Sequence, residues 1–184
     1  SGNGMDTRAL VIAIEEIGKE CPSTAATMMA HTSLGTAPIA IFGNEEQKKK
    51  YLPLLATGKI IGAFGLTEPE AGSDAGNTQT KAVKHNDEYI INGQKVFCTN
   101  AGKAGTIIIT ASIEEKGENK GIGAFIIESD NPGLKIGEKE NKMGWKGSDT
   151  RSIYFEDMKL SKESLLGSPS KGFKQFLQTL TGGR

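Results

Sequence analysis

The sequence of 184 residues carries 22 basic and 22 acidic side chains, which cancel, and 36% of its residues are hydrophobic. That composition is typical of a globular protein, and its charge balance argues against a nucleic-acid-binding surface. No apolar run approaches the ~20 residues that a membrane-spanning helix needs. The two cysteines, Cys21 and Cys98, lie too far apart in sequence for a disulfide framework or a structural zinc site, which favours a reducing compartment.

The first third of the chain has the periodicity of α-helices. Between residues 10 and 17, apolar side chains recur at i, i+4 and i+7 with charged residues between them, which predicts a helix with one apolar face. Pro22 is predicted to end this helix, because proline cannot continue the hydrogen-bond ladder. Ser23 or Thr24 is then predicted to cap a second helix.

A third helix is predicted to begin after Asn44. The side chains of Asn44 and Gln47 have the spacing of a capping box, in which each satisfies a free backbone N–H of the other. Pro53 should shorten or kink this helix.

From residue 60 onward the sequence changes to short strand-like runs separated by turn residues. Asn92-Gly93, between two such runs, predicts a β-hairpin, because a type I′ turn needs two positive φ angles. The 24 glycines suit a compact barrel with many corners. The predicted strands are 60–66, 78–84, 88–91, 94–99, 106–112, 122–128 and 151–156.

A last helix is predicted from Lys171 onward, where apolar residues lie at helical spacing up to the end of the chain. The predicted fold class is α+β, with an N-terminal helical segment, a middle antiparallel β-barrel domain and the first part of a C-terminal helix. The predicted boundaries are 1–57 for the helical segment, 58–167 for the β-domain and 168–184 for the last part.

The most informative segment is residues 64–74, FGLTEPEAGSD, where a strand passes into a polar turn. Gly72 permits close backbone approach, and the turn amides with the Thr67 and Ser73 hydroxyls offer donors to an anionic or carbonyl-rich ligand. The same residues suit an ordinary surface turn. This segment alone leaves both interpretations open.

Two further segments favour the ligand-binding interpretation. Residues 92–100, NGQKVFCTN, and 144–151, GWKGSDTR, follow the first segment in an order and spacing that resemble the acyl-CoA dehydrogenase family. The resemblance runs along the whole chain, including 2–6 and 42–48, and looks greatest to the short-chain, butyryl-CoA-type members. It implies an enzyme that uses FAD to oxidise a short-chain acyl-CoA to a trans-2-enoyl-CoA.

The resemblance implies which residues of the first segment bind the cofactor. The backbone of Leu66 and the backbone and hydroxyl of Thr67 would bond the pyrimidine edge of the flavin. Ser73 would meet the cofactor pyrophosphate and also the pantetheine arm of the substrate. Phe64 and Gly72 belong to the same cofactor-binding turn.

In the second segment, the resemblance implies that Thr99 donates to flavin N5 and that Phe97 and Cys98 cover one face of the ring. Cys98 is also expected to be a small buried hydrophobe rather than a nucleophile. Many relatives have tryptophan in place of Phe97 and aspartate in place of Thr181. With Ser73, the implied substrate-binding residues are those that end the chain: Thr181, Gly182, Gly183 and Arg184.

The family reaction pairs removal of the α-proton by a glutamate with transfer of the β-hydrogen to the flavin. Isovaleryl- and long-chain-type relatives carry this glutamate where the present chain has Gly183. The resemblance therefore places the base beyond Arg184 and no catalytic residue within the chain. It also implies that residues 168–184 begin a truncated C-terminal helical domain.

Other candidate chemistry is sparse. The two histidines, His31 and His85, have no partner at metal-ligand spacing, so no metal site is predicted. His31 is expected near a core or subunit contact and His85 in an exposed turn. Trp145 fits a core aromatic or a partner surface, and Arg151 fits subunit assembly or the adenosine half of the cofactor.

The resemblance further implies an electron-transfer flavoprotein as partner and a homotetramer for the full-length protein, with neither nucleic acid nor membrane bound. It implies a cytoplasmic location in a bacterium and the mitochondrial matrix in a eukaryote. The alternative hypothesis is a non-catalytic binding or interaction module that keeps the fold.

Overall fold

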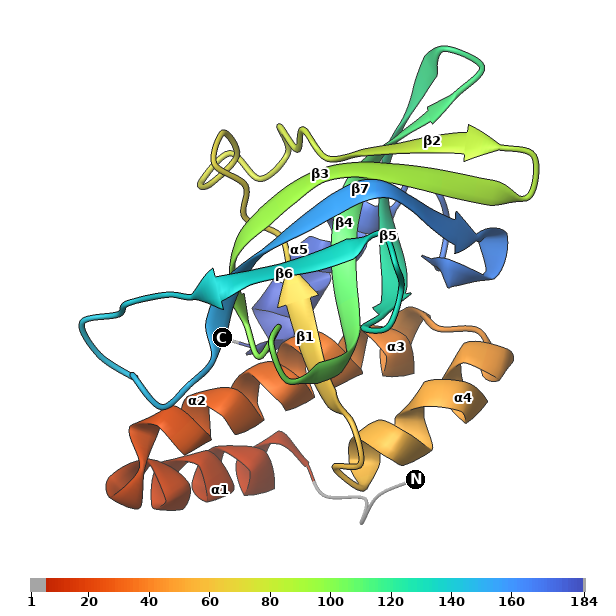
Figure 1. Cartoon of the computed structure of the whole chain (residues 1–184). Helices are drawn as coiled ribbons and strands as arrows, with labels where there is room; N and C mark the ends of the chain where they lie inside the picture. The colour runs from red at the N-terminus through yellow and green to blue at the C-terminus, as the bar shows by residue number, and fades with distance from the viewer. Residues whose placement is uncertain (1–5, 184) are drawn as a thin grey trace.

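The structure, a computed structural model, describes residues 6–183, so Arg184 and residues 2–5 of the quoted amino-terminal segment lie outside it. Within these residues no helix is long and apolar enough to cross a membrane. Helices α1 to α4 gather at one end of a strongly curved sheet, and α5 lies behind the strands (Figure 1). The helical elements are α1 (Thr7–Glu20), α2 (Pro22–Met29), the π-helical segment η1 (Ala30–Thr36), α3 (Ala37–Phe42), α4 (Glu45–Ala56), the 3-10 turn η2 (Lys162–Ser164) and α5 (Gly172–Gly183).

Local capping explains where the first helices begin. The Asp6 carboxylate caps α1 by accepting from Ala9 N at 3.1 Å. The predicted capping box of α4 is confirmed, because Asn44 Oδ1 accepts from Gln47 N at 2.8 Å and Gln47 Oε1 accepts from Asn44 N at 3.0 Å. This helix continues through the proline at position 53 to Ala56.

The predicted cap of α2 is wrong. The helix begins at Pro22, before either predicted cap residue, with Cys21 as the N-cap residue and no side-chain capping bond. Proline fits the first helical position, because its fixed φ is helical and its missing N–H is not needed there. Ser23 and Thr24 therefore lie inside the first turn.

The eight strands of the described chain form one sheet with the order β6-β7-β3-β2-β4-β5-β8, and β1 pairs with β4 outside this path. Most neighbours are antiparallel, but β1 and β2 run parallel to β4. The strands are β1 (Ile61–Gly65), β2 (Lys81–His85), β3 (Glu88–Thr99), β4 (Ala104–Glu115), β5 (Glu118–Glu128), β6 (Leu134–Lys139), β7 (Thr150–Ser161) and β8 (Leu165–Leu166).

The predicted α+β class, with a helical segment before an antiparallel β-domain and a helix after it, is confirmed. Closure into a barrel is not, because the end strands β6 and β8 do not pair with each other in the described chain. β8 pairs over only two residues of β5, which leaves too short an edge to complete a ring. The boundaries at 57/58 and 167/168 stay a prediction.

The predicted hairpin at Asn92-Gly93 is wrong, because β3 runs through both residues. Gly93 has a φ of 142° and packs its backbone against Thr80, where a Cβ would lie 2.7 Å from the hydroxyl oxygen. The Asn92 side chain instead bonds across to β7, accepting from Asp157 N at 2.9 Å. The tight turn is at the residues between β2 and β3, where Asn86 has a φ of 56°.

Both faces of β4 and β5 are buried, which explains their long apolar runs. Ile107, Ile109 and Phe125 point into the core enclosed by the curved sheet. Ile108 and Ile126 point to the other face and pack against α3 and α4. The sheet thus joins two cores and holds the helices at a fixed position.

The crossing of η1 over β1 sets how closely helices approach the sheet. Gly35 and Gly62 meet there backbone to backbone, and a Cβ on Gly35 would overlap the main chain of Gly62. His31 Nδ1 accepts a hydrogen bond from Gly62 N at 2.9 Å. Because β1 leads directly into the polar turn after Phe64, this crossing fixes one side of the candidate site.

Candidate functional site

The turn after β1 and the end of β3 meet at one cavity of about 160 Å³. Thr67 comes from the turn and Thr99 from β3, while η1 and α5 supply apolar walls. Predicted cofactor residues thus converge from two segments that are far apart in sequence. The cavity is lined by Ala30, Leu34, Phe64, Leu66, Thr67, Val96, Phe97, Thr99, Phe176 and Leu180.

Other predicted site residues lie outside this lining. The Cys98 side chain is 1% exposed and belongs to the main core. Gly72 and Ser73 lie on the exposed part of the turn, and Thr181 is exposed near the end of α5. Gly182 and Gly183 end the same helix, and the prediction for Arg184 falls outside the described residues.

A bulge at the end of β3 presents Phe97 to the surface. Strand residues alternate in direction, so Lys95 and Cys98 would normally face opposite sides of the sheet. Both are buried, and the pairing with β7 shifts register between them. Phe97 is the extra residue of this bulge. It has a φ of 57° and is 64% exposed. The bulge therefore brings Phe97 and Thr99 together at the cavity.

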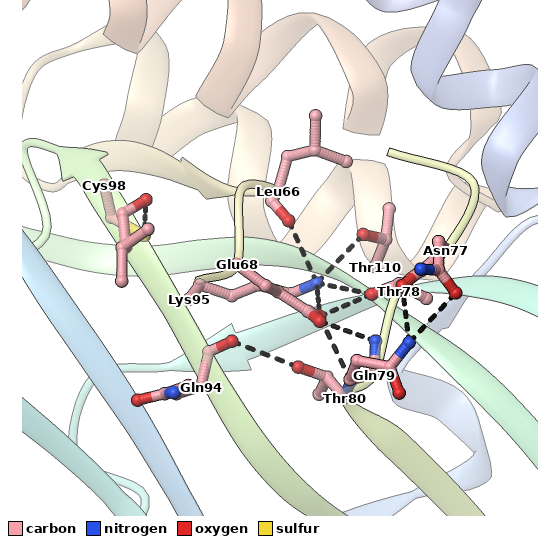
Figure 2. Close-up of polar contacts among 11 residues, drawn as sticks. Leu66, Glu68, Asn77, Thr78, Gln79, Thr80, Gln94, Lys95, Cys98 and Thr110 are labelled. Atoms are coloured by element: carbon pink, nitrogen blue, oxygen red, sulfur yellow. Dashed lines mark hydrogen bonds and ion pairs between the residues drawn. The ribbon is translucent and has the colours of Figure 1, made fainter. Parts of the chain in front are cut away.

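A buried ion pair that the sequence analysis missed bonds to Leu66, a residue of the cavity lining (Figure 2). Lys95 Nζ lies 2.6 Å from Glu68 Oε1, and both side chains are at most 2% exposed. The ammonium also donates to the carbonyl oxygen of Leu66 at 3.1 Å and to the hydroxyls of Thr78 and Thr110 at 3.0 and 3.3 Å. One signal was available, because Lys95 is a charge inside a strand-like run.

The Glu68 carboxylate is bonded on every side. It accepts from the Thr78 hydroxyl, from Gln79 N at 2.5 Å and from Thr80 N at 3.1 Å, in addition to the Lys95 ammonium. Burial alone would raise the pKa of Glu68, but the bonds from Lys95, Thr78 and Thr80 outweigh it and lower the pKa to about 2.

Burial is the largest influence on the pKa of Lys95 and on that of Cys98. It lowers the pKa of Lys95, and the bond to Glu68 opposes the shift only in part. It raises the pKa of the Cys98 thiol to about 12, so this cysteine is protonated and inert at neutral pH. Its expected character as a small buried hydrophobe agrees with this environment.

Hydrogen bonds from the side chains of Asn100 and Asp149 hold the turn that follows Thr99. Asn100 has a φ of 71°, and its side chain donates to the carbonyl oxygens of Thr27 at 3.1 Å and Gly62 at 3.4 Å. Asp149 accepts from Gly102 N at 2.7 Å and from Arg151 Nε at 2.8 Å. The helices, β1 and β3 are therefore joined directly beside the cavity.

Arg151 is held by bonds within the chain, whereas Trp145 is exposed on a loop. Arg151 bonds within the chain, to Asp149 and to the carbonyl oxygen of Gly137 at 3.0 Å. Trp145 is not a core aromatic: it lies 59% exposed on the loop before β7, with a φ of 50°. The loop between β6 and β7 that carries this residue extends away from the sheet (Figure 1). No cluster of three or more metal-ligating side chains occurs among residues 6–183.

Comparison with protein families decides the relationship. The acyl-CoA dehydrogenase N-terminal domain matches residues 1–59, and the acyl-CoA dehydrogenase middle domain matches residues 63–158. The chain belongs to the acyl-CoA dehydrogenase family. Together the two matches cover the helices before the turn and the strands that form the cavity.

Individual relatives agree with this assignment. The short-chain specific acyl-CoA dehydrogenase of Clostridium acetobutylicum is 48% identical over 100% of this chain and 48% of its own length. The structure of butyryl-CoA dehydrogenase from Megasphaera elsdenii has a TM-score of 0.93 and 44% identity, over 98% of this chain and 48% of that chain.

An acyl-CoA dehydrogenase from Bacillus anthracis, whose structure is described as complexed with FAD, has a TM-score of 0.92 and 41% identity, over 99% of this chain and 31% of that chain. The present chain thus spans about half the length of its curated relatives.

Proposed function

We propose that the chain is part of an FAD-dependent acyl-CoA dehydrogenase that oxidises a short-chain acyl-CoA to the trans-2-enoyl-CoA. The observation that carries the proposal is the convergence of Thr67, Phe97 and Thr99 on one cavity in a chain of this family. The short-chain specificity rests on the names of its relatives.

The residues around the cavity fit the ring of a flavin. Leu34, Phe64 and Leu180 supply the apolar walls that a flat aromatic ring needs. The hydroxyls of Thr67 and Thr99 bond to no other residue in the described part of the chain, so both are available to a ligand. These features suit a ring that is apolar on its faces and polar at its edges.

Each residue has a proposed task. FAD, when bound, supplies a hydride acceptor at N5. The backbone of Leu66 and the backbone and hydroxyl of Thr67 hold the pyrimidine edge, while the Thr99 hydroxyl donates at N5 and fixes the ring orientation. Phe97 shields one face from water, whereas Cys98 points into the main core and away from the ring.

The remaining contacts lie outside the cavity lining. Gly72 and Ser73 are proposed to lie at the cofactor pyrophosphate. Ser73 is also proposed to contact the pantetheine arm of the substrate. Thr181 to Arg184 are proposed to contact the substrate. The catalytic glutamate is expected beyond Arg184, which agrees with a chain that spans about half of its relatives. An electron-transfer flavoprotein partner and a homotetramer are further proposals that rest on family membership.

The test uses the full-length protein. Its flavin absorbance is recorded before and after anaerobic addition of butyryl-CoA. Bleaching of a bound flavin is the expected result, and Thr99→Val should slow it while Thr57→Val, at the exposed end of α4, should not. Bound flavin without bleaching would contradict the substrate, and absence of flavin would favour the non-catalytic binding module.

A further inference from the structure

The buried Lys95–Glu68 pair has no role in the function described so far. Taking two charges out of water is expensive, and apolar residues of similar volume are often as stabilising or more so. Here the ammonium group is surrounded by oxygen atoms from four residues and sits directly under the polar turn. Its contact with the main chain of this turn (Figure 2) indicates what the pair does.

That contact falls on the peptide that joins Leu66 to Thr67. Lys95 Nζ donates to the carbonyl oxygen of Leu66 at 3.1 Å. In a planar trans peptide the C=O and N–H groups point in opposite directions, and the described chain has no cis peptide. The carbonyl is held inward by the ammonium, so the N–H of Thr67 points outward, on the side where Leu66 and Thr67 line the cavity.

The next peptide, which joins Thr67 to Glu68, is also held by β3. The carbonyl oxygen of Thr67 accepts from Val96 N at 2.7 Å, so two consecutive residues of β3 hold the turn. Among residues 6–183, no group accepts a hydrogen bond from Thr67 N. This N–H is therefore a fixed donor at the cavity with its bonding capacity free.

Glu68 extends the arrangement to the rest of the turn. Its carboxylate draws the backbone of Gln79 and Thr80 to the ammonium. Its own backbone closes a tight turn with Ala71, through bonds of 3.0 Å and 3.2 Å. Gly72 and Ser73 follow immediately, so one ion pair sets both ends of the predicted cofactor-binding segment.

We propose that Lys95, anchored by Glu68, is a positioning residue that orients and polarises the Leu66–Thr67 peptide, so that Thr67 N–H is a strengthened donor to the flavin edge. The inference rests on the proposed function. A bond from an ammonium to the carbonyl oxygen draws electron density through the peptide and makes its N–H more positive. A ring that gains negative charge on reduction then binds more tightly when reduced than when oxidised.

The test is the midpoint potential of the bound flavin in the full-length protein, together with the Kd of oxidised flavin. Lys95→Met/Glu68→Gln removes the polarising charge without leaving a single charge buried. Lys84→Met/Glu115→Gln is the matched control, because Lys84 and Glu115 form another cross-strand pair, at 2.9 Å, that is about a third exposed and away from the cavity.

We expect the first double variant to weaken the binding of oxidised flavin about tenfold, because the Thr67 N–H loses the strengthening that the ammonium charge gives it. The binding of reduced flavin should be weakened further. Each extra tenfold loss of affinity for the reduced form lowers the two-electron midpoint potential by about 30 mV. The control should change neither quantity. A higher Kd with an unchanged potential would mean that the pair only supports the fold, and would overturn the inference.

If the double variant does not fold, the midpoint potential of the flavin bound to Glu68→Gln at pH 6 tests the inference instead. This substitution leaves the ammonium on Leu66 without its counter-charge, so the potential should rise, and an unchanged or lower potential contradicts the proposal. A wild-type protein without flavin would overturn both this inference and the proposed function. Bound flavin with unchanged potentials in all variants would overturn this inference alone.

Discussion

Replacement of Asn100 tests how the helices are joined to the candidate site. Asn100 is 1% exposed, and its amide bonds to two carbonyl groups, one from α2 and one from β1. Each net hydrogen bond is worth ~1 kcal/mol, and glycine adds a backbone entropy cost of ~0.5–1 kcal/mol. Asn100→Gly keeps the positive φ and should lower the free energy of unfolding by about 2–3 kcal/mol.

Asn100→Ala loses the same bonds and must also adopt the left-handed conformation. Since that conformation costs a residue with a Cβ ~1–2 kcal/mol, the alanine variant should be less stable than the glycine variant by about 1 kcal/mol. Asn86→Gly is the control, because Asn86 also has a positive φ but lies exposed in the turn before β3. It should change stability by less than ~1 kcal/mol.

The assay is equilibrium unfolding in urea followed by circular dichroism, with the slope of each transition compared with wild type. Equal stabilities of Asn100→Ala and Asn100→Gly would refute the argument from backbone conformation. A loss below ~1 kcal/mol in both would refute the argument from the two hydrogen bonds.

Three further predictions concern the packing and titration of single residues. Gly35→Ala should destabilise by ~1–3 kcal/mol, because its Cβ overlaps the backbone of Gly62, whereas Gly144→Ala, with open space around it, should leave the melting temperature unchanged. Burial lowers the pKa of His31, which must stay neutral to accept a hydrogen bond from Gly62 N. The stability that this bond contributes should therefore be complete above the unfolded pKa of ~6.5 and fall as the pH drops below it. An equal dependence of the melting temperature on pH in His31→Gln would contradict this. Cys21 is exposed and Cys98 buried, so native Cys21→Ser protein should resist alkylation at pH 8, and rapid labelling of it would show that the core around Cys98 opens.

Local rules predicted what is encoded locally. The capping box at Asn44 depends on residues three apart and holds in the structure. The apolar runs of β4 and β5 predicted strands correctly, because both faces of these strands are buried and consecutive residues in these runs are therefore apolar. In contrast, the signal at Asn92-Gly93 was overridden by a tertiary contact, since Asn92 pairs with Asp157, which lies far along the chain.

The candidate site was predictable only in part. The quoted segments around Thr67 and Thr99 meet at one cavity, but spacing alone gives no register for them. The pairing of Glu68 with Lys95 required knowing that a bulge turns Lys95 inward and that the turn folds over it. A buried lysine can be suspected from a strand pattern, whereas its partner follows only from the three-dimensional arrangement.

The most direct test of the central claim is a crystal structure of the full-length protein grown with FAD. We expect the flavin ring to occupy the cavity between the turn after β1 and the end of β3, with Thr67 N at its pyrimidine edge and the Thr99 hydroxyl at N5. A flavin bound elsewhere, or a cavity filled by the protein's own side chains, would contradict it.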